Sequence, residues 1–423
     1  MKKGIYALSP LILFIVLYLI TSIIIGDFYK IPITVAFLIS SIYALLTSKG
    51  TIDERINIFS EGAGSKNMMY MLWIFILAGA FASTAKSMGA VDATVNLTLR
   101  ILPDSLLLPG LFIASCFISL AIGTSVGTIA ALVPVATGIA QQADINTSMI
   151  IAIIVGGAYF GDNLSFISDT TIVATQTQEC RMSDKFRVNS KIVFPVALFV
   201  LVIYLFKGLD LNIQHPSEEI NLVKIIPYLT VIIVSLCGIN VMIVLIIGII
   251  LSGIIGIIYG DYSFFGWFES MSNGMLNMSE LIIMTLLAAG MLAIIKHNGG
   301  IDYIIKILTK NIKGKKGAEM SIAALTWLVN ICTANNTVAI ITVGPIAKNI
   351  SQKYGIDKRK CASILDTASC SAQGLLPYGA QMLIAAGLAS INPVSIIPYL
   401  FYPMALIIAI LVSILFRYPR KYS

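Results

Sequence analysis

The stretch VKIIPYLTVIIVSLCGINVMIVLIIGIILSGIIGIIY at residues 223–259 carries one charged side chain, Lys224. A membrane-spanning helix needs about 20 apolar residues, so this stretch is long enough for two crossings. The 423-residue chain is 57% hydrophobic and 12% charged, whereas a soluble domain is about 25% charged. These features predict an all-α polytopic membrane protein and argue against a nucleic-acid-binding protein, a secreted disulfide protein and a soluble enzyme. Further apolar runs lie at 4–25, 31–48, 68–85, 192–206, 281–295 and 396–416.

The two halves of the chain share short sequence matches at a nearly constant offset. KSMGAVD at 86–92 matches KHNGGID at 296–302, an offset of 210 residues. NLSFISDTTIVA at 163–174 aligns with GLLPYGAQMLIA at 374–385, an offset of 211. A constant offset near half the chain length indicates a duplicated unit. We therefore predict two repeats, residues 1–210 and 211–423, each with five transmembrane segments.

Two long segments carry a polar break near the centre. The segment 105–140 contains GTSVGT at 123–128, and the segment 318–349 contains TANNT at 333–337. Each segment is too long for one straight crossing, so we predict a re-entrant hairpin that enters and leaves the membrane on the same side. Non-helical backbone at membrane depth persists only where protein buries it or water reaches it.

The basic residues set the predicted orientation. With these hairpins and with broken crossings at 148–178 and 360–390, most of the 28 Lys and Arg, including Lys185 and Lys360, fall on one side. The positive-inside rule assigns that side, and both termini, to the cytoplasm. The first half then starts inside and the second outside, so the repeats are inverted, which is typical of secondary transporters. The net charge of +7 follows from this topology, with some attraction to anionic lipid.

Three acidic residues fall within the predicted broken crossings: Asp162, Asp169 and Asp366. An ionised carboxylate in a span costs at least about 2.5–3.5 kcal/mol and is normally paired, protonated or bound to a cation. Two other interpretations stay open. Asp169 could cap a helix at the break, and Asp366 could simply hydrogen-bond Thr367 or Ser369.

The stretch GDNLSFISDTT at 161–171 is the densest polar cluster at the predicted membrane depth. Its carboxylate, amide and hydroxyl oxygens are hard ligands that suit a hard cation such as sodium. A carboxylate that binds either a cation or a proton, but not both at once, can exchange one for the other. The predicted binding residues here are Asp162, Asn163, Ser165, Ser168, Asp169 and Thr170, with Asp162 and Asp169 as sodium ligands.

The hairpin tips and the second broken crossing complete the predicted site. Thr124 and Ser125 lie at one tip, and Asn335, Asn336 and Thr337 lie at the other. These side chains could bind an ion or a substrate, or they could only cap the hairpin turns.

The second broken crossing adds Asp366, Ser369 and Gln373 to the predicted site. At the offset of 211, Gln373 aligns with Asp162 and Ala380 aligns with Asp169. We therefore expect the first half to carry the charge that couples to the cation.

With these residues in view, the chain resembles the NhaC family of sodium/proton antiporters, within the ion-transporter superfamily. The family pattern, approximately GDxxSPxSDTT, stands here as GDNLSFISDTT, with Phe166 in place of the usual proline. The NNT at 335–337 is similar to the Ser-Asn-Thr hairpin tips of the superfamily. The resemblance covers nearly the whole chain and implies sodium/proton exchange, although some relatives exchange organic acids or amino acids. It places at the motif positions Asp162, Ser165, Ser168, Asp169 and Thr170.

The predicted function is secondary active exchange of sodium for protons across the cytoplasmic membrane by alternating access. The alternative is a sodium- or proton-coupled transporter of a small organic anion or amino acid. No arginine falls in the predicted site to bind a carboxylate, although helix N-termini can do so. An enzyme is not expected, because HExxH is absent; a paired-aspartate protease is the one enzymatic version considered. The predicted partners are the lipid bilayer, sodium and protons, with no nucleic acid and no cofactor, and a homodimer is left open.

Overall fold

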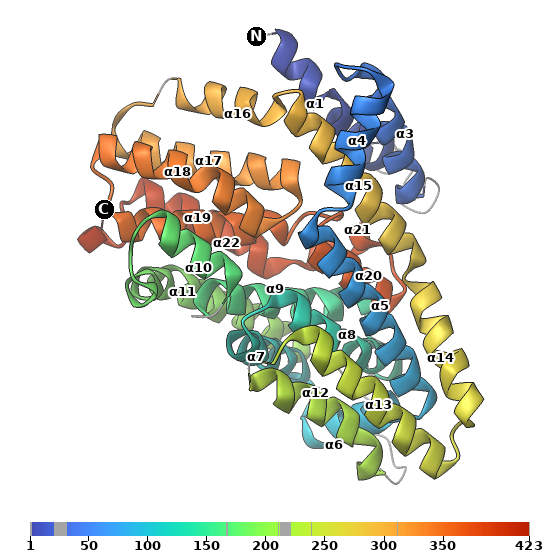
Figure 1. Ribbon diagram of the computed structural model, residues 1–423. Helices are drawn as coiled ribbons and strands as arrows, with labels where there is room; N and C mark the ends of the chain where they lie inside the picture. Colours follow the sequence, from blue (N-terminus) through green and yellow to red (C-terminus); the bar gives the residue numbers. More distant parts are fainter. Residues whose placement is uncertain are drawn as a thin grey trace.

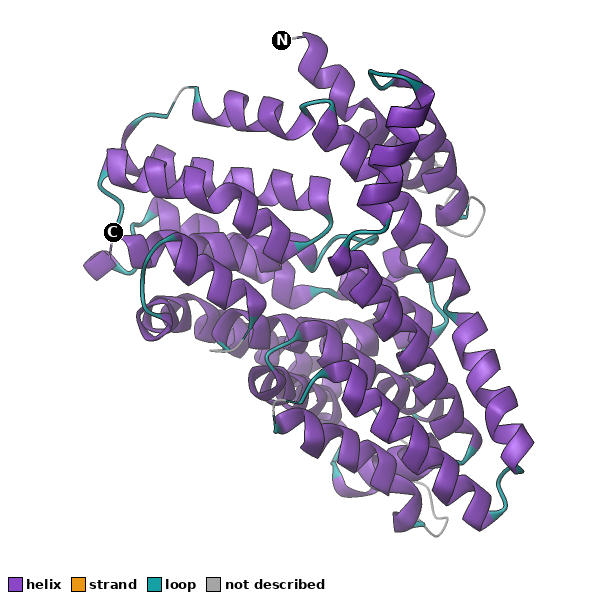
Figure 2. Ribbon diagram, viewed as in Figure 1, coloured by secondary structure: helices purple, strands orange, loops and turns teal. Residues whose placement is uncertain are grey.

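The computed structural model describes residues 2–20, 32–165, 168–209, 211, 221–237, 239–310 and 312–422. Phe166 therefore lies outside the described residues. Helices make up the fold, and the described residues contain no β-strand (Figure 2). The prediction of an all-α protein is confirmed.

Figure 1 shows the order and arrangement of the helices along the chain. The first half contains α1 (Lys2–Ile15) with a π-helical turn (Val16–Ile20), α3 (Ile33–Thr47), α4 (Ile52–Ala63), α5 (Lys66–Ser87), α6 (Ala90–Ile101), α7 (Asp104–Ile122), α8 (Ser125–Gln142), α9 (Thr147–Leu164), α10 (Asp169–Thr177) and α11 (Met182–Leu209).

The second half has a similar succession of elements. It contains a 3-10 turn (Leu222–Ile225), α12 (Ile226–Leu236), α13 (Val241–Tyr259), α14 (Phe264–Asn277), α15 (Ser279–His297), α16 (Gly300–Thr309), α17 (Gly314–Thr333), α18 (Asn336–Tyr354), α19 (Lys358–Gln373), α20 (Ala380–Ala389), α21 (Pro393–Ile396) with a 3-10 turn (Ile397–Tyr399), α22 (Phe401–Leu415) and a last 3-10 turn (Arg420–Tyr422).

Several helices are long and apolar enough to span a bilayer. Within the described residues five segments qualify by length and composition, and a sixth qualifies if Ala380–Ala389 and Pro393–Tyr399, bent by 100°, count as one span. Shorter apolar helices cover four other predicted crossings, at 6–18, 33–47, 222–234 and 401–415. The protein is therefore an integral membrane protein, while the total of ten crossings stays a prediction. The five segments are Met68–Ser87, Thr147–Thr177, Met182–Leu209, Val241–Tyr259 and Phe264–His297.

All four breaks predicted from the sequence are present. Gly123 and Thr124 separate α7 from α8, and Ala334 and Asn335 separate α17 from α18. Gly123 ends α7 with a φ of +75°, a conformation that glycine adopts without a steric penalty. Helices α9 and α10 are separated at 165–168, and α19 and α20 at 374–379.

Corresponding helices of the two halves make corresponding contacts. Helix α5 packs along α14, as α15 packs along α4, and both pairs lie side by side in Figure 1. Helix α10 packs on α18, as α20 packs on α8. Ser119 Oγ donates to the Ala158 carbonyl oxygen at 2.6 Å, and Asn330 Nδ2 donates to the Ser369 carbonyl oxygen at 2.7 Å. The two halves therefore share these contacts, while their division into two inverted repeats stays a prediction.

Four helices were not predicted from the sequence: α4, α6, α14 and α16. Each connects or flanks longer helices and has 10 to 14 residues. Helices this short are marginal on their own, and tertiary packing supplies most of their stability, so the local sequence does not indicate them clearly. Helix α14, for example, packs so closely on α5 that Gly274 and Gly79 face each other without side chains.

Two lysines that the predicted topology placed in cytoplasmic loops are buried inside the protein. Lys185, in the first turn of α11, is 1% exposed, and Lys360, in the first turn of α19, is fully buried. Lys360 donates to Ser413 Oγ and to the Tyr418 carbonyl oxygen. A sequence-based count of basic residues treats every lysine as solvated, so it misplaced both.

Candidate functional site

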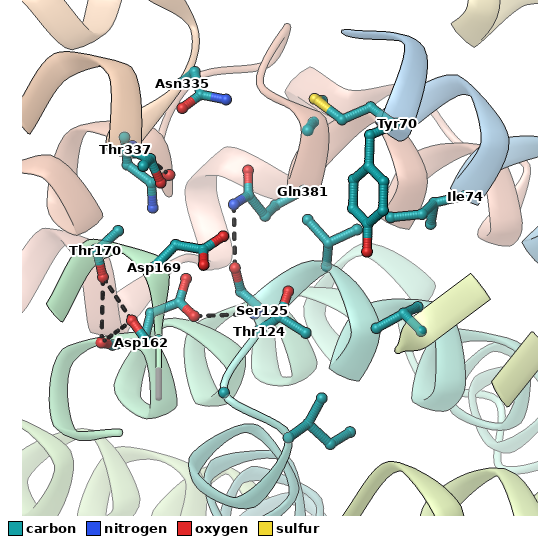
Figure 3. A pocket seen from close by; sticks show the side chains of 18 of the residues that line it. Tyr70, Ile74, Thr124, Ser125, Asp162, Asp169, Thr170, Asn335, Thr337 and Gln381 are labelled. Carbon is teal, nitrogen blue, oxygen red and sulfur yellow. Dashed lines mark hydrogen bonds between the residues drawn. The ribbon is translucent and has the colours of Figure 1, made fainter. Parts of the chain in front are cut away.

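The breaks in the helices meet around one cavity of about 330 Å³. Both hairpin tips, the end of α9, the start of α10, the break between α19 and α20, the start of α13 and one face of α5 line it. Figure 3 shows the side chains of Asp162 and Asp169 facing this space beside Ser125 and Gln381. Segments more than 200 residues apart in the sequence therefore contribute to a single polar site.

Most of the residues predicted from the sequence line this cavity. They are Thr124, Ser125, Asp162, Ser168, Asp169, Thr170, Asn335, Asn336, Thr337 and Gln373. Four predicted residues lie outside its lining: Asn163, Ser165, Asp366 and Ser369.

Asp162 sits at the end of α9, directly opposite the start of α8. Its Oδ1 accepts a hydrogen bond from the backbone N–H of Ser125 at 3.0 Å, and the residue is 5% exposed. Because Ser125 is the first residue of α8, the carboxylate lies at the positive end of that helix. The helix N-terminus therefore stabilises a negative charge that the apolar surroundings would otherwise disfavour.

The break after α9 is held by hydroxyl groups. Ser168 Oγ donates to the Asp162 carbonyl oxygen at 3.0 Å and accepts from the backbone N–H of Thr171 at 3.4 Å, so Ser168 caps α10. Thr170 Oγ1 also lies 3.4 Å from that carbonyl oxygen. Asp169 is the first residue of α10 rather than its cap, and its side chain is exposed to the cavity. The capping interpretation of Asp169 is therefore wrong.

The second half places amides where the first half has an acid. Gln373 Nε2 donates to the carbonyl oxygen of Ala334 at 3.0 Å and to Gln381 Oε1 at 3.0 Å. Gln381 Nε2 in turn donates to Ser125 Oγ at 3.1 Å. Asp162 thus accepts from the tip of the first hairpin, while Gln373 donates to the tip of the second, and Gln381 joins the two halves.

Five helices begin at the cavity: α8, α10, α13, α18 and α20. Asn335 caps α18 by accepting from the Val338 N–H at 2.9 Å, so the capping interpretation holds for this residue. Asn240 caps α13 by accepting from the Met242 N–H at 2.9 Å. The aligned peptide dipoles of these helices make the cavity favourable for negative charge, which Asp162 and Asp169 supply.

Three polar residues of the lining were missed from the sequence. Tyr70 and Asn240 carried no local signal, because Tyr70 lies within α5 and Asn240 directly precedes α13, two helices with the apolar sequence of an ordinary span. Gln381 could have been found, since at the offset of 211 it aligns with Thr170.

The predicted residues outside the cavity serve internal contacts. Asn163 Nδ2 donates to the Tyr402 hydroxyl at 3.1 Å, Ser165 Oγ donates to the Leu120 carbonyl oxygen at 2.9 Å, and Ser369 Oγ donates to the Asp366 carbonyl oxygen at 2.9 Å. The carboxylate of Asp366 forms an ion pair with Lys185 at 2.7 Å.

Two further cavities flank the site. One of about 440 Å³ follows α5, α8 and α20 away from the site cavity and is lined by Lys86 and Asp92, among others. The two cavities share no lining residue, and along these helices the buried residues Phe75, Ala130 and Ile384 lie between the two linings in the sequence. The other, of about 360 Å³, lies between α4, α15 and the second hairpin; its lining includes Lys66 and Lys296 and shares Asn335 with the site cavity.

Comparison with known proteins agrees with the resemblance seen in the sequence. The model of the Na+/H+ antiporter family matches residues 1–209 and 217–419. The Na(+)/H(+) antiporter NhaC of Bacillus subtilis (strain 168) is 24% identical over 394 residues, which cover 85% of this chain and 86% of that protein. The malate-2H(+)/Na(+)-lactate antiporter of the same organism is 21% identical over 392 residues, covering 85% of this chain and 83% of that protein.

A crystal structure of the YdaH transporter of Alcanivorax borkumensis is also similar, with a TM-score of 0.46 at 14% identity, covering 91% of this chain and 99% of that chain. The family model extends over both halves of the sequence, including the broken helices and both hairpin tips. The chain belongs to the Na+/H+ antiporter family.

Proposed function

We propose that the protein exchanges sodium for protons across the cytoplasmic membrane, with both termini in the cytoplasm. The observation that carries the proposal is the pair of carboxylates, Asp162 and Asp169, that face one cavity at the N-termini of α8 and α10. Hydroxyl and amide oxygens surround the pair, and hard oxygen ligands of this kind suit sodium. Membership of the Na+/H+ antiporter family supports the same assignment.

The exchange follows from competition at the carboxylates. An ionised carboxylate attracts sodium by its charge, whereas a protonated carboxyl group loses that charge and most of its ability to bind a cation. Asp162 keeps its contact with Ser125 N–H in either state, because each carboxyl group has two oxygens. Asp169 is exposed to the cavity and can take up an ion or a proton from water that enters there.

Access to the site would alternate between the two flanking cavities. We propose that in the present conformation the site opens toward the cavity at Lys66 and Lys296, the flanking cavity with which it has the lining residue Asn335 in common. The cavity at Lys86 is then the closed path, since it shares no lining residue with the site. Inverted repeats let the same helices exchange these two arrangements.

Transport by the purified protein in liposomes tests this function. With an internal pH dye and no organic solute, an inward sodium gradient is expected to move protons outward and to raise the internal pH. The Asp162→Asn protein is the matched control. A wild-type protein that moves protons only when an organic solute is added would contradict sodium/proton exchange.

A second candidate is coupled transport of a small organic anion. The cavity of about 330 Å³ is roughly ten times the volume of one water molecule, so it has room for more than a bare sodium ion. The N-termini of α13 and α18 also face it without a carboxylate of their own first turn. One relative is named as an antiporter of malate and lactate. Solute-dependent proton movement in the same liposomes would favour this candidate.

Gln381→Met is expected to raise the sodium concentration for half-maximal exchange by about three- to tenfold, a net effect of about 1 kcal/mol from the loss of its two hydrogen bonds. The substitution removes the contact with Ser125 Oγ and the acceptor of Gln373. Sodium titration of the initial rate in liposomes measures the change. Gln178→Met is a matched control, since Gln178 donates to the Gly344 carbonyl oxygen outside the cavity lining. Equal shifts in both variants would contradict a role of Gln381 in the site.

A further inference from the structure

A buried ammonium group lies immediately behind the site. Lys185 Nζ, in the first turn of α11, is 2.7 Å from Asp366 Oδ2 of α19, 2.8 Å from the Asn163 carbonyl oxygen and 2.6 Å from Thr171 Oγ1. An ammonium has three N–H donors, and three acceptors from three different helices meet them. Asn189, one turn further along α11, donates to both Asp366 Oδ2 and the Asn163 carbonyl oxygen.

Two residues that contact Lys185 each directly follow, in the sequence, a residue that lines the cavity. Asn163 follows Asp162 at the end of α9, and Thr171 follows Thr170 at the start of α10. Asp162 and Thr170 line the cavity, whereas the Asn163 carbonyl oxygen and the Thr171 hydroxyl lie on the ammonium. The break between α9 and α10 is therefore bounded on one side by the cavity and on the other by the side chain of Lys185.

The carboxylate of Asp366 balances the charge of Lys185. The ion pair of these two residues is neutral overall, so it adds little net charge to the neighbouring cavity. Asp366 and Asn189 are both fully buried. A buried pair of this kind contributes little to stability compared with an apolar pair of similar volume, although breaking it by removing one partner is costly. The contribution of the ion pair is therefore to geometry, because its hydrogen bonds give the break between α9 and α10 a shape that apolar side chains would not give.

We propose that Lys185 is a positioning residue for the sodium site, an inference that rests on the proposed function. Its ammonium connects the end of α9 to the start of α10 and fixes the spacing of Asp162 and Thr170 on the opposite side of the break. Asp366 does not take part in exchange; it neutralises Lys185. The site is thus already shaped for sodium when no sodium is bound, and a loss of the ammonium weakens sodium binding more than turnover.

The decisive variant is Lys185→Met combined with Asp366→Asn, which removes both charges and leaves no buried charge unpaired. Without the ammonium, the Asn163 carbonyl oxygen and the Thr171 hydroxyl lose the donor that connects them. The half-saturating sodium concentration is therefore expected to rise about tenfold or more. The maximal rate is expected to stay within about threefold of wild type, because the exchanging carboxylates remain. Liposome exchange over a range of sodium concentrations separates the two parameters.

Thr171→Val provides a second variant that keeps both charges. It is close in volume to the natural residue and removes the hydroxyl, which accepts from Lys185 at 2.6 Å and donates to the Asp162 carbonyl oxygen at 3.4 Å, so a rise of about three- to tenfold in half-saturating sodium is expected. Lys360→Met is the matched control, as Lys360 is also a buried lysine but contacts Ser413 and Tyr418 away from the site. It should leave half-saturating sodium unchanged.

Wild-type sodium dependence in the folded double variant or in Thr171→Val would overturn the positioning role. If the double variant does not fold, Thr171→Val alone decides the question. A wild-type protein that shows no sodium-driven proton movement would instead contradict the proposed function, so the two failures are distinguishable.

Discussion

Asp162→Asn is expected to abolish sodium/proton exchange while the protein remains folded. The amide cannot release or take up a proton and binds sodium without a full negative charge, so the exchange rate should fall at least about 100-fold, or about 2.7 kcal/mol. The fold should persist because the amide oxygen can still accept from the Ser125 N–H, now at 3.0 Å from Oδ1. The rate of sodium-driven pH change in liposomes measures the loss.

Two further substitutions make the result specific. Asp169→Asn is expected to abolish exchange as well, because Asp169 faces the same cavity. Asp302→Asn serves as the control, since Asp302 is an exposed carboxylate in the first turn of α16, outside the site. Wild-type exchange in both Asp162→Asn and Asp169→Asn would disprove the assignment of the site, and a large loss in Asp302→Asn would point to a general effect of charge.

Gly161→Ala is expected to destabilise the protein and to displace the site. Helices α7 and α9 approach so closely here that a Cβ on Gly161 would overlap both the side chain and the backbone of Ser119. Because backbone atoms cannot move aside as a flexible side chain can, the helices must separate, at a cost of about 1–3 kcal/mol or more. The midpoint temperature of unfolding in detergent should fall, and exchange should fall with it, since Asp162 follows directly.

Gly317→Ala is the matched control for this effect. Gly317 also lies in a helix, α17, but a Cβ there would meet no atom within 4 Å. Alanine favours a helix over glycine by about 1 kcal/mol, so this variant should be as stable as the wild type or more so. If Gly161→Ala unfolds at the same temperature as Gly317→Ala, the close contact between α7 and α9 does not limit stability.

The breaks in the helices and most of the polar residues of the cavity lining were predictable from the sequence. In an apolar chain, clusters such as GTSVGT and TANNT stand out, and their breaks at Gly123 and Asn335 have local causes. The offset between the halves then placed Gln373 opposite Asp162 without any knowledge of contacts. These predictions depended on clusters of polar residues and on the matches between the two halves, and both can be seen in a single sequence.

The partner of Asp366 was not predictable in the same way. Lys185 lies in a polar segment with Arg181 and Arg187, and nothing local distinguishes a lysine that points into the protein from its solvated neighbours. Asn163 was misplaced for a similar reason. It adjoins Asp162 in sequence, but successive residues of a helix point in different directions, and Asn163 faces Tyr402 instead of the cavity.

The ion pair between Lys185 and Asp366 also bears on how the chain is assembled during synthesis. Lys185 emerges from the ribosome with α11, whereas α19, which carries Asp366, follows only after α12 to α18 have been made. N-terminal parts of a chain generally fold first, but here the first half holds a lysine whose neutralising carboxylate does not yet exist. Burial of that lysine must wait, so the first half reaches its final shape only when the second half arrives.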